Sequence, residues 1–183
     1  MTLSEGKKKV YMLLDEYSSG GVVTEDEDIE NKMASFFDMA QKELARIVPI
    51  VKVAEIEQEP GVTEYAMPED FWKLKKIWRS GRAYRGYRWK AGKLIIPETE
   101  TQPVEVEYFA NPAQITENTP ENYVFEVSDN AAQAMPFYVA AQQLIVDLVM
   151  DYSAPWAMWM QMKQDLINSG TGERATLTNV LFR

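Results

Sequence analysis

The 183-residue sequence contains neither cysteine nor histidine. Without cysteine, the fold cannot depend on disulfides or thiolate metal sites, and a cysteine nucleophile is excluded. Without histidine, the chain lacks the usual general base near neutral pH and the commonest metal ligand of proteins. These absences exclude Ser-His-Asp and Cys-His catalysis and zincin sites, and we expect neither a metal nor a cofactor.

Long apolar runs are also absent. The densest apolar stretch, residues 144–150, is much shorter than the roughly 18 residues that a membrane helix needs, and it contains Asp147. Residues 1–7 lack the apolar core of a secretory signal peptide. We therefore expect an intracellular protein without membrane contact.

Carboxylate chemistry is the enzymatic alternative that these absences leave open. Glu105 and Glu107 alternate along one predicted strand, so they would share a face and imitate the carboxylate pair of a glycosidase. A solvent-facing strand produces the same alternation without any chemistry. Phosphate-binding glycine motifs are missing from the sequence. We therefore predict a protein that is not an enzyme and has no catalytic residues.

Residues 73–93 form the most unusual segment, because they contain nine basic residues and no acidic one. The net charge of the whole chain is −9, so the remainder carries −18. Aromatic residues alternate here with Arg79, Arg82, Arg85 and Arg88. Arginine and aromatic side chains together contact phosphates and stack on bases, which makes non-specific DNA contact one interpretation.

Two further interpretations of residues 73–93 stay open. In the first, the segment is a solvated hairpin whose aromatic side chains pack on the helices, and this is favoured over direct DNA contact. In the second, the basic face meets an acidic surface of a neighbouring subunit in an oligomer. The overall charge of −9 argues against sequence-specific DNA binding, because phosphate repulsion opposes approach from most directions.

Helical periodicity of apolar residues predicts four helices, at about residues 3–18, 25–48, 136–152 and 154–169. The pairs Thr2/Glu5 and Thr24/Glu27 have the spacing of a capping box, in which each side chain binds the other residue's backbone N–H. Pro136 is predicted to occupy the first position of the third helix, where its missing N–H costs nothing.

Residues 50–110 change to the alternating periodicity of strands. Ala91-Gly92 is a hairpin signal, and Val104, Val106 and Tyr108 are predicted to face the same side of a strand. We therefore expect an α+β fold, in which a small antiparallel β-sheet is inserted between the helix pairs of a four-helix bundle-like domain. This single domain covers residues 1–170, and residues 171–183 form an extended C-terminal arm.

The last predicted helix is apolar over more of its circumference than one buried stripe requires. The candidate residues for a subunit interface are Trp156, Met158, Trp159 and Met162. Burial by helices on two sides within one subunit explains the same pattern equally well.

Beyond Gly170, the arm carries the apolar residues Leu177, Val180, Leu181 and Phe182. Such an arm would add a strand to a partner's sheet, which is favoured over a frayed end or a strand of its own sheet.

Several phrases of the sequence resemble the head–tail connector proteins of tailed bacteriophages, also called adaptor or head completion proteins. The first is Tyr65-Ala-Met-Pro-Glu-Asp-Phe71, in which Met67 replaces the family's usual leucine. Three further phrases follow in the same order as in the family. Residues 89–97 resemble its glycine-turned strand pair, and residues 104–112 resemble the next strand, which ends in a proline. Residues 129–141 resemble the start of its third major helix.

This resemblance implies a structural protein and not an enzyme. Members of such a family form a ring, expected to be dodecameric, that docks under the portal protein, lines the DNA passage and receives tail completion proteins. The C-terminal arm would reach the portal protein, and residues 73–93 would face DNA or an adjoining ring. The protein would be located in the cytoplasm of the host bacterium during assembly and then in the virion. The alternative is a DNA-binding or packaging accessory protein that uses residues 73–93.

Overall fold

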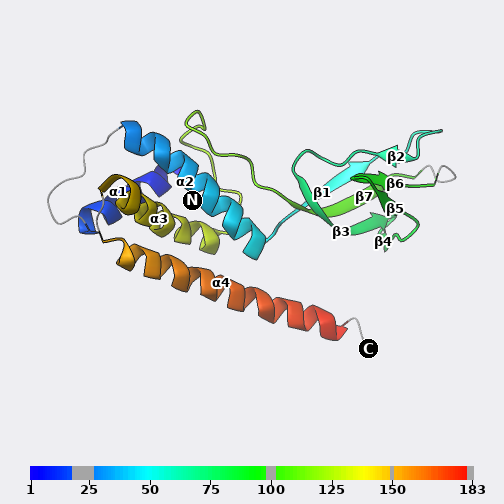
Figure 1. Cartoon of the computed structure of the whole chain (residues 1–183). Helices are drawn as coiled ribbons and strands as arrows, with labels where there is room; N and C mark the ends of the chain where they lie inside the picture. Colours follow the sequence, from blue (N-terminus) through cyan, green and yellow to red (C-terminus); the bar gives the residue numbers. More distant parts are fainter. Residues whose placement is uncertain (18–26, 98–101, 149–150, 181–183) are drawn as a thin grey trace. The chain divides into compact units, whose positions relative to one another are not determined.

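The computed structural model describes residues 1–17, 27–97, 102–148 and 151–180, and it divides the chain into two compact units (Figure 1). The helical unit comprises Met1–Val48 and Pro112–Arg183, and the sheet unit, Pro49–Asn111, is inserted between them. The α+β class is confirmed. The insertion lies where the sequence analysis expected the sheet, but the sheet and the helices form two separate units where we expected one domain.

The helical unit has four α-helices within the described ranges: α1 (Leu3–Tyr17), α2 (Glu27–Ile47), α3 (Asp129–Gln143) and α4 (Ser153–Val180). A π-helical segment, η1 (Leu144–Leu148), follows α3 directly. Helix α3 is central, since α1, α2 and α4 all pack against it. Its buried residues include many alanines, whose small side chains allow three neighbours to approach closely.

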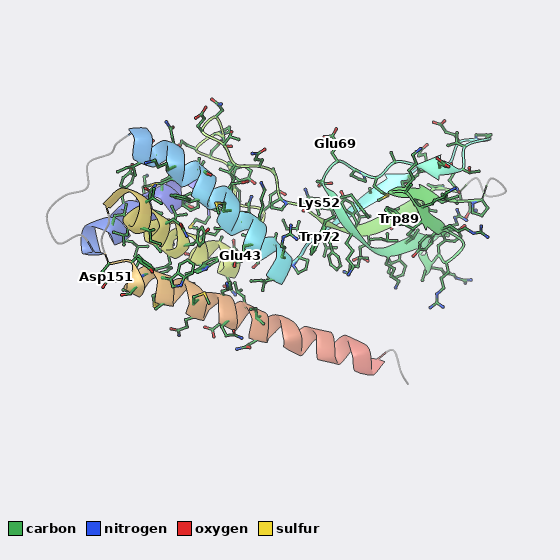
Figure 2. The ribbon with its side chains drawn as sticks, viewed as in Figure 1. Glu43, Lys52, Glu69, Trp72, Trp89 and Asp151 are labelled. Atoms are coloured by element: carbon green, nitrogen blue, oxygen red, sulfur yellow. The ribbon has the colours of Figure 1, made fainter. Side chains whose placement is uncertain are left out.

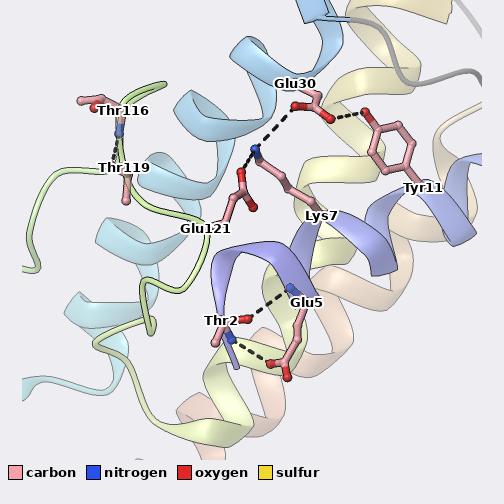
Figure 3. A network of polar contacts seen from close by, with 8 residues as sticks. All are labelled: Thr2, Glu5, Lys7, Tyr11, Glu30, Thr116, Thr119 and Glu121. Carbon is pink, nitrogen blue, oxygen red and sulfur yellow. Dashed lines mark hydrogen bonds and ion pairs between the residues drawn. The ribbon is translucent and has the colours of Figure 1, made fainter.

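The capping box at the start of α1 is confirmed (Figure 3). The backbone N–H of Thr2 donates to Glu5 Oε2 at 2.8 Å, and the N–H of Glu5 donates to Thr2 Oγ1 at 3.2 Å. The hydrogen bond from the Thr2 backbone lowers the pKa of Glu5. The second predicted box, at Thr24 and Glu27, lies partly outside the described residues.

The predicted position of Pro136 is wrong. Helix α3 starts seven residues earlier, at Asp129, with Ser128 as its N-cap, and Pro136 lies inside the helix. An interior proline removes one hydrogen bond and costs ~3 kcal/mol. The burial of α3 against three other helices offsets this cost, and a local sequence rule does not include that contribution.

The last helix is also longer than predicted. Gly170 was expected to end it, but the backbone of α4 continues as a helix to Val180. The extended conformation expected for the first part of the arm is therefore corrected to helix. With 28 residues, α4 measures about 42 Å at 1.5 Å per residue.

The sheet unit contains two antiparallel sheets where the sequence analysis expected one. The strands of the larger sheet, in spatial order, are β1 (Ile50–Ile56), β7 (Val104–Ala110), β3 (Phe71–Arg79) and β4 (Arg82–Ala83). The smaller sheet has β2 (Glu64–Tyr65), β6 (Lys93–Ile95) and β5 (Arg88–Lys90). The predicted alternation in β7 is confirmed, because Val104, Val106 and Tyr108 are buried together.

Two tight turns join the strands of this unit. Ala91 and Gly92 have φ values of +50° and +77°, and Lys90 pairs with Lys93 across them. Ser80 has a φ of +47°, and the following glycine has a φ of +73°. Two successive residues with positive φ match the right-handed twist of a two-residue hairpin, so the hairpin predicted from Ala91-Gly92 is confirmed.

Asp70 ties three strands of the larger sheet together at one end. Its carboxylate accepts hydrogen bonds from Lys52 Nζ of β1 at 2.9 Å and from the hydroxyl of Tyr108 of β7 at 3.0 Å. Its backbone carbonyl accepts from the N–H of Asn111 at 2.7 Å. Partial burial alone would raise the pKa of Asp70, but the bonds from Lys52 and Tyr108 outweigh this effect and lower it.

We expect Asp70→Asn to lower the free energy of unfolding of the sheet unit by about 1 kcal/mol near neutral pH. A group whose pKa is lowered by folding stabilises above its unfolded-state pKa, and this contribution is lost as the pH falls through the folded-state pKa. The variant and the wild type should therefore converge in acid. Urea unfolding at a series of pH values measures this difference, and a gap that persists below the pKa of Asp70 would contradict the assignment.

Candidate interaction surfaces

The arginines of residues 73–93 differ in their surroundings. Arg79 of β3 is partly buried, donates to Gln58 Oε1 at 2.7 Å and lies 4.0 Å from the centre of the Tyr84 ring. It is therefore fixed within its own unit and is not part of an open binding face. Arg82, Arg85 and Arg88 are exposed, as is the neighbouring Lys90. We call these four residues the basic strip.

A recess of about 510 Å³ adjoins the basic strip. Arg85 and Arg88 line it together with Tyr87, Ile95 and residues that flank the strands of the smaller sheet. Next to these arginines, the hydroxyl of Tyr84 donates to the carbonyl of Gly86 at 2.7 Å. A Cβ at position 86 would lie 2.5 Å from that hydroxyl, so glycine is required for this approach. The recess combines two guanidinium groups with an apolar wall.

The aromatic residues of this segment mostly pack within the sheet unit, whereas the hairpin interpretation expected them to pack on the helices. Trp78 Nε1 donates to Glu107 Oε2 at 3.3 Å, and Lys76 Nζ lies 3.5 Å from the centre of the Trp78 ring. Trp89 stacks on Phe71 with ring centroids 5.2 Å apart, and Figure 2 shows it on the sheet unit. Trp89 remains 43% exposed, so it is the aromatic residue of the segment that is most open to a partner.

Of the carboxylate pair considered for catalysis, Glu107 forms an ion pair with a lysine. Glu107 accepts from Lys75 Nζ at 2.7 Å, and this hydrogen bond lowers the pKa of Glu107. A general acid of a glycosidase needs a raised pKa, so the environment shifts Glu107 in the opposite direction. Glu105 is exposed on the same strand.

Within α4, the four predicted interface residues have different environments. Trp159 is fully buried in its own chain, and its ring lies 5.1 Å from that of Tyr138 of α3. It therefore belongs to the core, and its assignment to an interface is corrected. Trp156 is half-buried beside Tyr138, whereas Met158 is 40% exposed. Met158 and the partly exposed Met162 stay accessible to a neighbour.

Met162 also lines an apolar groove that the sequence analysis did not identify. Two hollows, of about 360 and 440 Å³, share Met162 and Gln133. Met12 and Leu13 of α1 and Phe137 of α3 line the first hollow. Met12 is 72% exposed, which is unusual for a large apolar side chain beside other apolar groups. The groove is thus a surface on which a protein partner would bury apolar area.

Residues 112–128 form an irregular but well-anchored loop, which we call the acidic loop. The buried side chain of Gln41 of α2 donates to the carbonyl of Ala113 and the hydroxyl of Tyr123, each at 3.2 Å. Its Oε1 accepts from the N–H of Glu126 at 2.9 Å. Asp38 accepts from the N–H of Ile115 at 3.0 Å. Helix α2 therefore fixes both ends of the loop.

The acidic loop presents carboxylates to solvent. Glu117 and Glu121 are exposed, and Figure 3 shows Glu121 beside Lys7, whose Nζ lies 2.5 Å from Glu121 Oε1 and 3.8 Å from Glu30 Oε2. The signal that would have indicated this surface is visible in the sequence. Residues 94–162 contain ten acidic residues and no basic one, directly after the basic segment.

For the predicted partner-binding arm, the structure describes only the backbone of residues 171–180. The backbone at Leu177 and Val180 belongs to α4, whereas Leu181 and Phe182 lie outside the described residues. The role of these four residues stays a prediction.

Two features are missing from the part of the chain that the structure describes. It contains no group of three or more acidic side chains positioned to hold a metal ion. Among the described helices, none has the length and apolar character that a membrane span requires.

Exposed charged surfaces, an apolar groove and the long α4 are features typical of proteins that assemble with other proteins. Residues 1–179 match the model of the family described as SU10 adaptor protein. The chain therefore belongs to this family of bacteriophage head–tail adaptors, which confirms the resemblance found in the sequence. It is a structural adaptor protein of the virion. No curated protein matches the sequence.

Proposed function

We propose that copies of this protein form a ring that connects the portal protein to the tail and surrounds the DNA passage. The observation that carries this proposal is the family match over residues 1–179. A ring of twelve copies would match a portal ring of the same symmetry. Assembly would take place in the cytoplasm of the host bacterium, with the portal protein and tail completion proteins as partners.

Exposed apolar side chains of the helical unit support an assembly role. Met12 is 72% exposed, Met39 of α2 is 51% exposed, and Met160 and Ile167 of α4 are 43% and 38% exposed. Burial of such side chains against a partner would stabilise an assembly. We propose that the apolar groove and Met158 become buried between neighbouring subunits or against the portal protein in the assembled connector.

The alternative function is that of a DNA-binding or packaging accessory protein. The exposed guanidinium groups of Arg82, Arg85 and Arg88 and the exposed face of Trp89 favour it. The net charge of −9 opposes it, because phosphate repulsion acts on the rest of the chain. We therefore favour a protein over DNA as the partner of the basic strip.

Co-purification with the portal protein encoded by the same phage tests the proposal. We expect a tagged portal protein to retain the full-length chain and to lose most of it when residues 171–183 are deleted, because the arm is proposed to reach the portal. The triple variant Leu177→Glu/Leu181→Glu/Phe182→Glu should behave like the deletion.

The variant Thr176→Ala/Asn179→Ala, which changes polar residues of the same segment, is the matched control and should bind like the wild type. Absence of portal binding by the full-length chain would refute the connector function. Equal binding by the full-length and shortened chains would refute the role of the arm.

A further inference from the structure

The two units of the chain carry different charges. The helical unit has nine basic and eighteen acidic residues, and the sheet unit has ten of each. Nine of the ten basic residues of the sheet unit lie within residues 73–93, so one part of an otherwise balanced unit is strongly positive. Helical units of neighbouring copies repel each other, whereas a helical unit and a basic strip attract. Charge alone therefore favours a head-to-tail contact between copies.

The basic strip is shaped to receive a carboxylate. Arg85 and Arg88 are exposed at the recess of about 510 Å³, and neither forms an ion pair within the described ranges. A planar guanidinium binds a carboxylate through two parallel N–H donors, which makes arginine the preferred partner of glutamate at interfaces. Tyr87 and Ile95 give the recess an apolar wall that would cover the stem of an incoming side chain.

The acidic loop presents such a side chain on a hydrogen-bonded turn. The N–H of Thr116 donates to Thr119 Oγ1 at 2.9 Å (Figure 3). The N–H of Thr119 donates to the carbonyl of Thr116 at 3.0 Å. Glu117 lies within this closed turn and is exposed. Because the turn is already ordered, binding through Glu117 loses little conformational entropy. Glu117, unlike Glu121, has no ion-pair partner within the described residues.

We infer that the basic strip of one copy binds the acidic loop of a second copy, with Arg85 and Arg88 enclosing the carboxylate of Glu117. The two surfaces differ, so the contact is heterologous, and repetition of such a contact closes a ring when the rotation between copies permits it. This inference rests on the proposed ring function and names the surfaces that would build the ring. The second copy is preferred to DNA because the chain as a whole is negative.

Cross-linking of full-length chains tests the contact, because the protein has no native cysteine. In the variant Lys90→Cys/Asn118→Cys, which keeps Arg85, Arg88 and Glu117, mild oxidation at low salt should link chains into dimers and longer species, and Arg85→Glu or high salt should suppress them. The matched control Lys90→Cys/Gln161→Cys carries its second thiol at an exposed position of α4 and should give only the background yield.

A charge exchange provides an independent test of the same contact. Arg85→Glu/Arg88→Glu and Glu117→Arg should each lose self-association in sedimentation at low salt, and an equimolar mixture of the two variants should regain it. A cross-link yield equal to that of the control overturns the inference, as does a disulfide formed within single chains. Wild-type binding to a labelled DNA duplex that is lost in Arg85→Glu/Arg88→Glu, without cross-linking, assigns the strip to nucleic acid instead.

These failures can be told apart from failure of the proposed function. If the portal protein retains the chain but the cysteine pair does not cross-link, the connector function stands and this contact is wrong. If the portal protein does not retain the chain, the connector function itself is wrong, whatever the cysteine pair does.

Discussion

Replacing Trp159 with alanine should lower the free energy of unfolding of the helical unit by about 3–5 kcal/mol. The Trp159 side chain is fully buried, and its ring packs at 5.1 Å from the ring of Tyr138. Truncation leaves a cavity between α3 and α4 that the surrounding helices cannot close. Urea unfolding followed by far-ultraviolet circular dichroism, which reports mainly on the helices, measures the change.

Met158→Ala is the matched control, because Met158 precedes Trp159 in α4 and is 40% exposed. It should change the stability by no more than about 0.5 kcal/mol. If Met158→Ala were as destabilising as Trp159→Ala, or if Trp159→Ala had little effect, the assignment of Trp159 to the core would be wrong. Trp159 would then be an interface residue, as the sequence pattern alone permits.

Gln41→Leu should lower the free energy of unfolding by about 2–3 kcal/mol, because it leaves buried polar groups without partners. Gln41 is fully buried and makes three hydrogen bonds to the acidic loop, with the carbonyl of Ala113, the hydroxyl of Tyr123 and the N–H of Glu126. The leucine has a similar size but can replace none of these bonds. The same urea titration measures the loss, and amide hydrogen exchange should show faster exchange at Glu126.

The control for this substitution is Gln143→Leu at a second buried glutamine. Gln143 donates one hydrogen bond, to the carbonyl of Ile29 at 2.9 Å, and its Oε1 has no partner within the described residues. Its replacement therefore leaves fewer groups unsatisfied and should be clearly less destabilising than Gln41→Leu. Equal losses for the two variants would show that Gln41 does not hold the acidic loop.

Local features of the fold were predictable because they depend on few residues. The capping box of Thr2 and Glu5 and the turn at Ala91-Gly92 need only the right side chains at fixed spacing. The alternation of β7 depends only on which face is buried. The position of Pro136 was not predictable from local rules. The packing of α3 against three helices outweighs the cost of an interior proline.

The candidate surfaces were predictable only in part. The sequence indicates that α4 has more apolar surface than one buried stripe requires. It does not predict which side of α4 the other helices cover. The structure covers Trp159 and exposes Met158. Likewise, Arg79 and Arg82 look equivalent in the sequence, yet a hydrogen bond to Gln58 and the ring of Tyr84 hold Arg79 within its unit.

The acidic loop was missed for a different reason. Its sequence is polar and contains prolines, which indicates an irregular segment, and its order comes from hydrogen bonds to Gln41 and Asp38 on a distant helix. Such long-range bonds have no periodic signal. The absence of basic residues from residues 94–162 was readable from the start, and Glu117, Glu121 and Glu126 of the acidic loop lie within this range.

The central claim, that this family member connects head to tail, is tested most directly by electron cryomicroscopy of the virion's portal vertex. We predict a ring of density between the portal and the first tail component into which the helical unit and the sheet unit each fit. Placement of this chain elsewhere in the particle, or its absence from mature virions that carry a complete head–tail junction, would contradict the account.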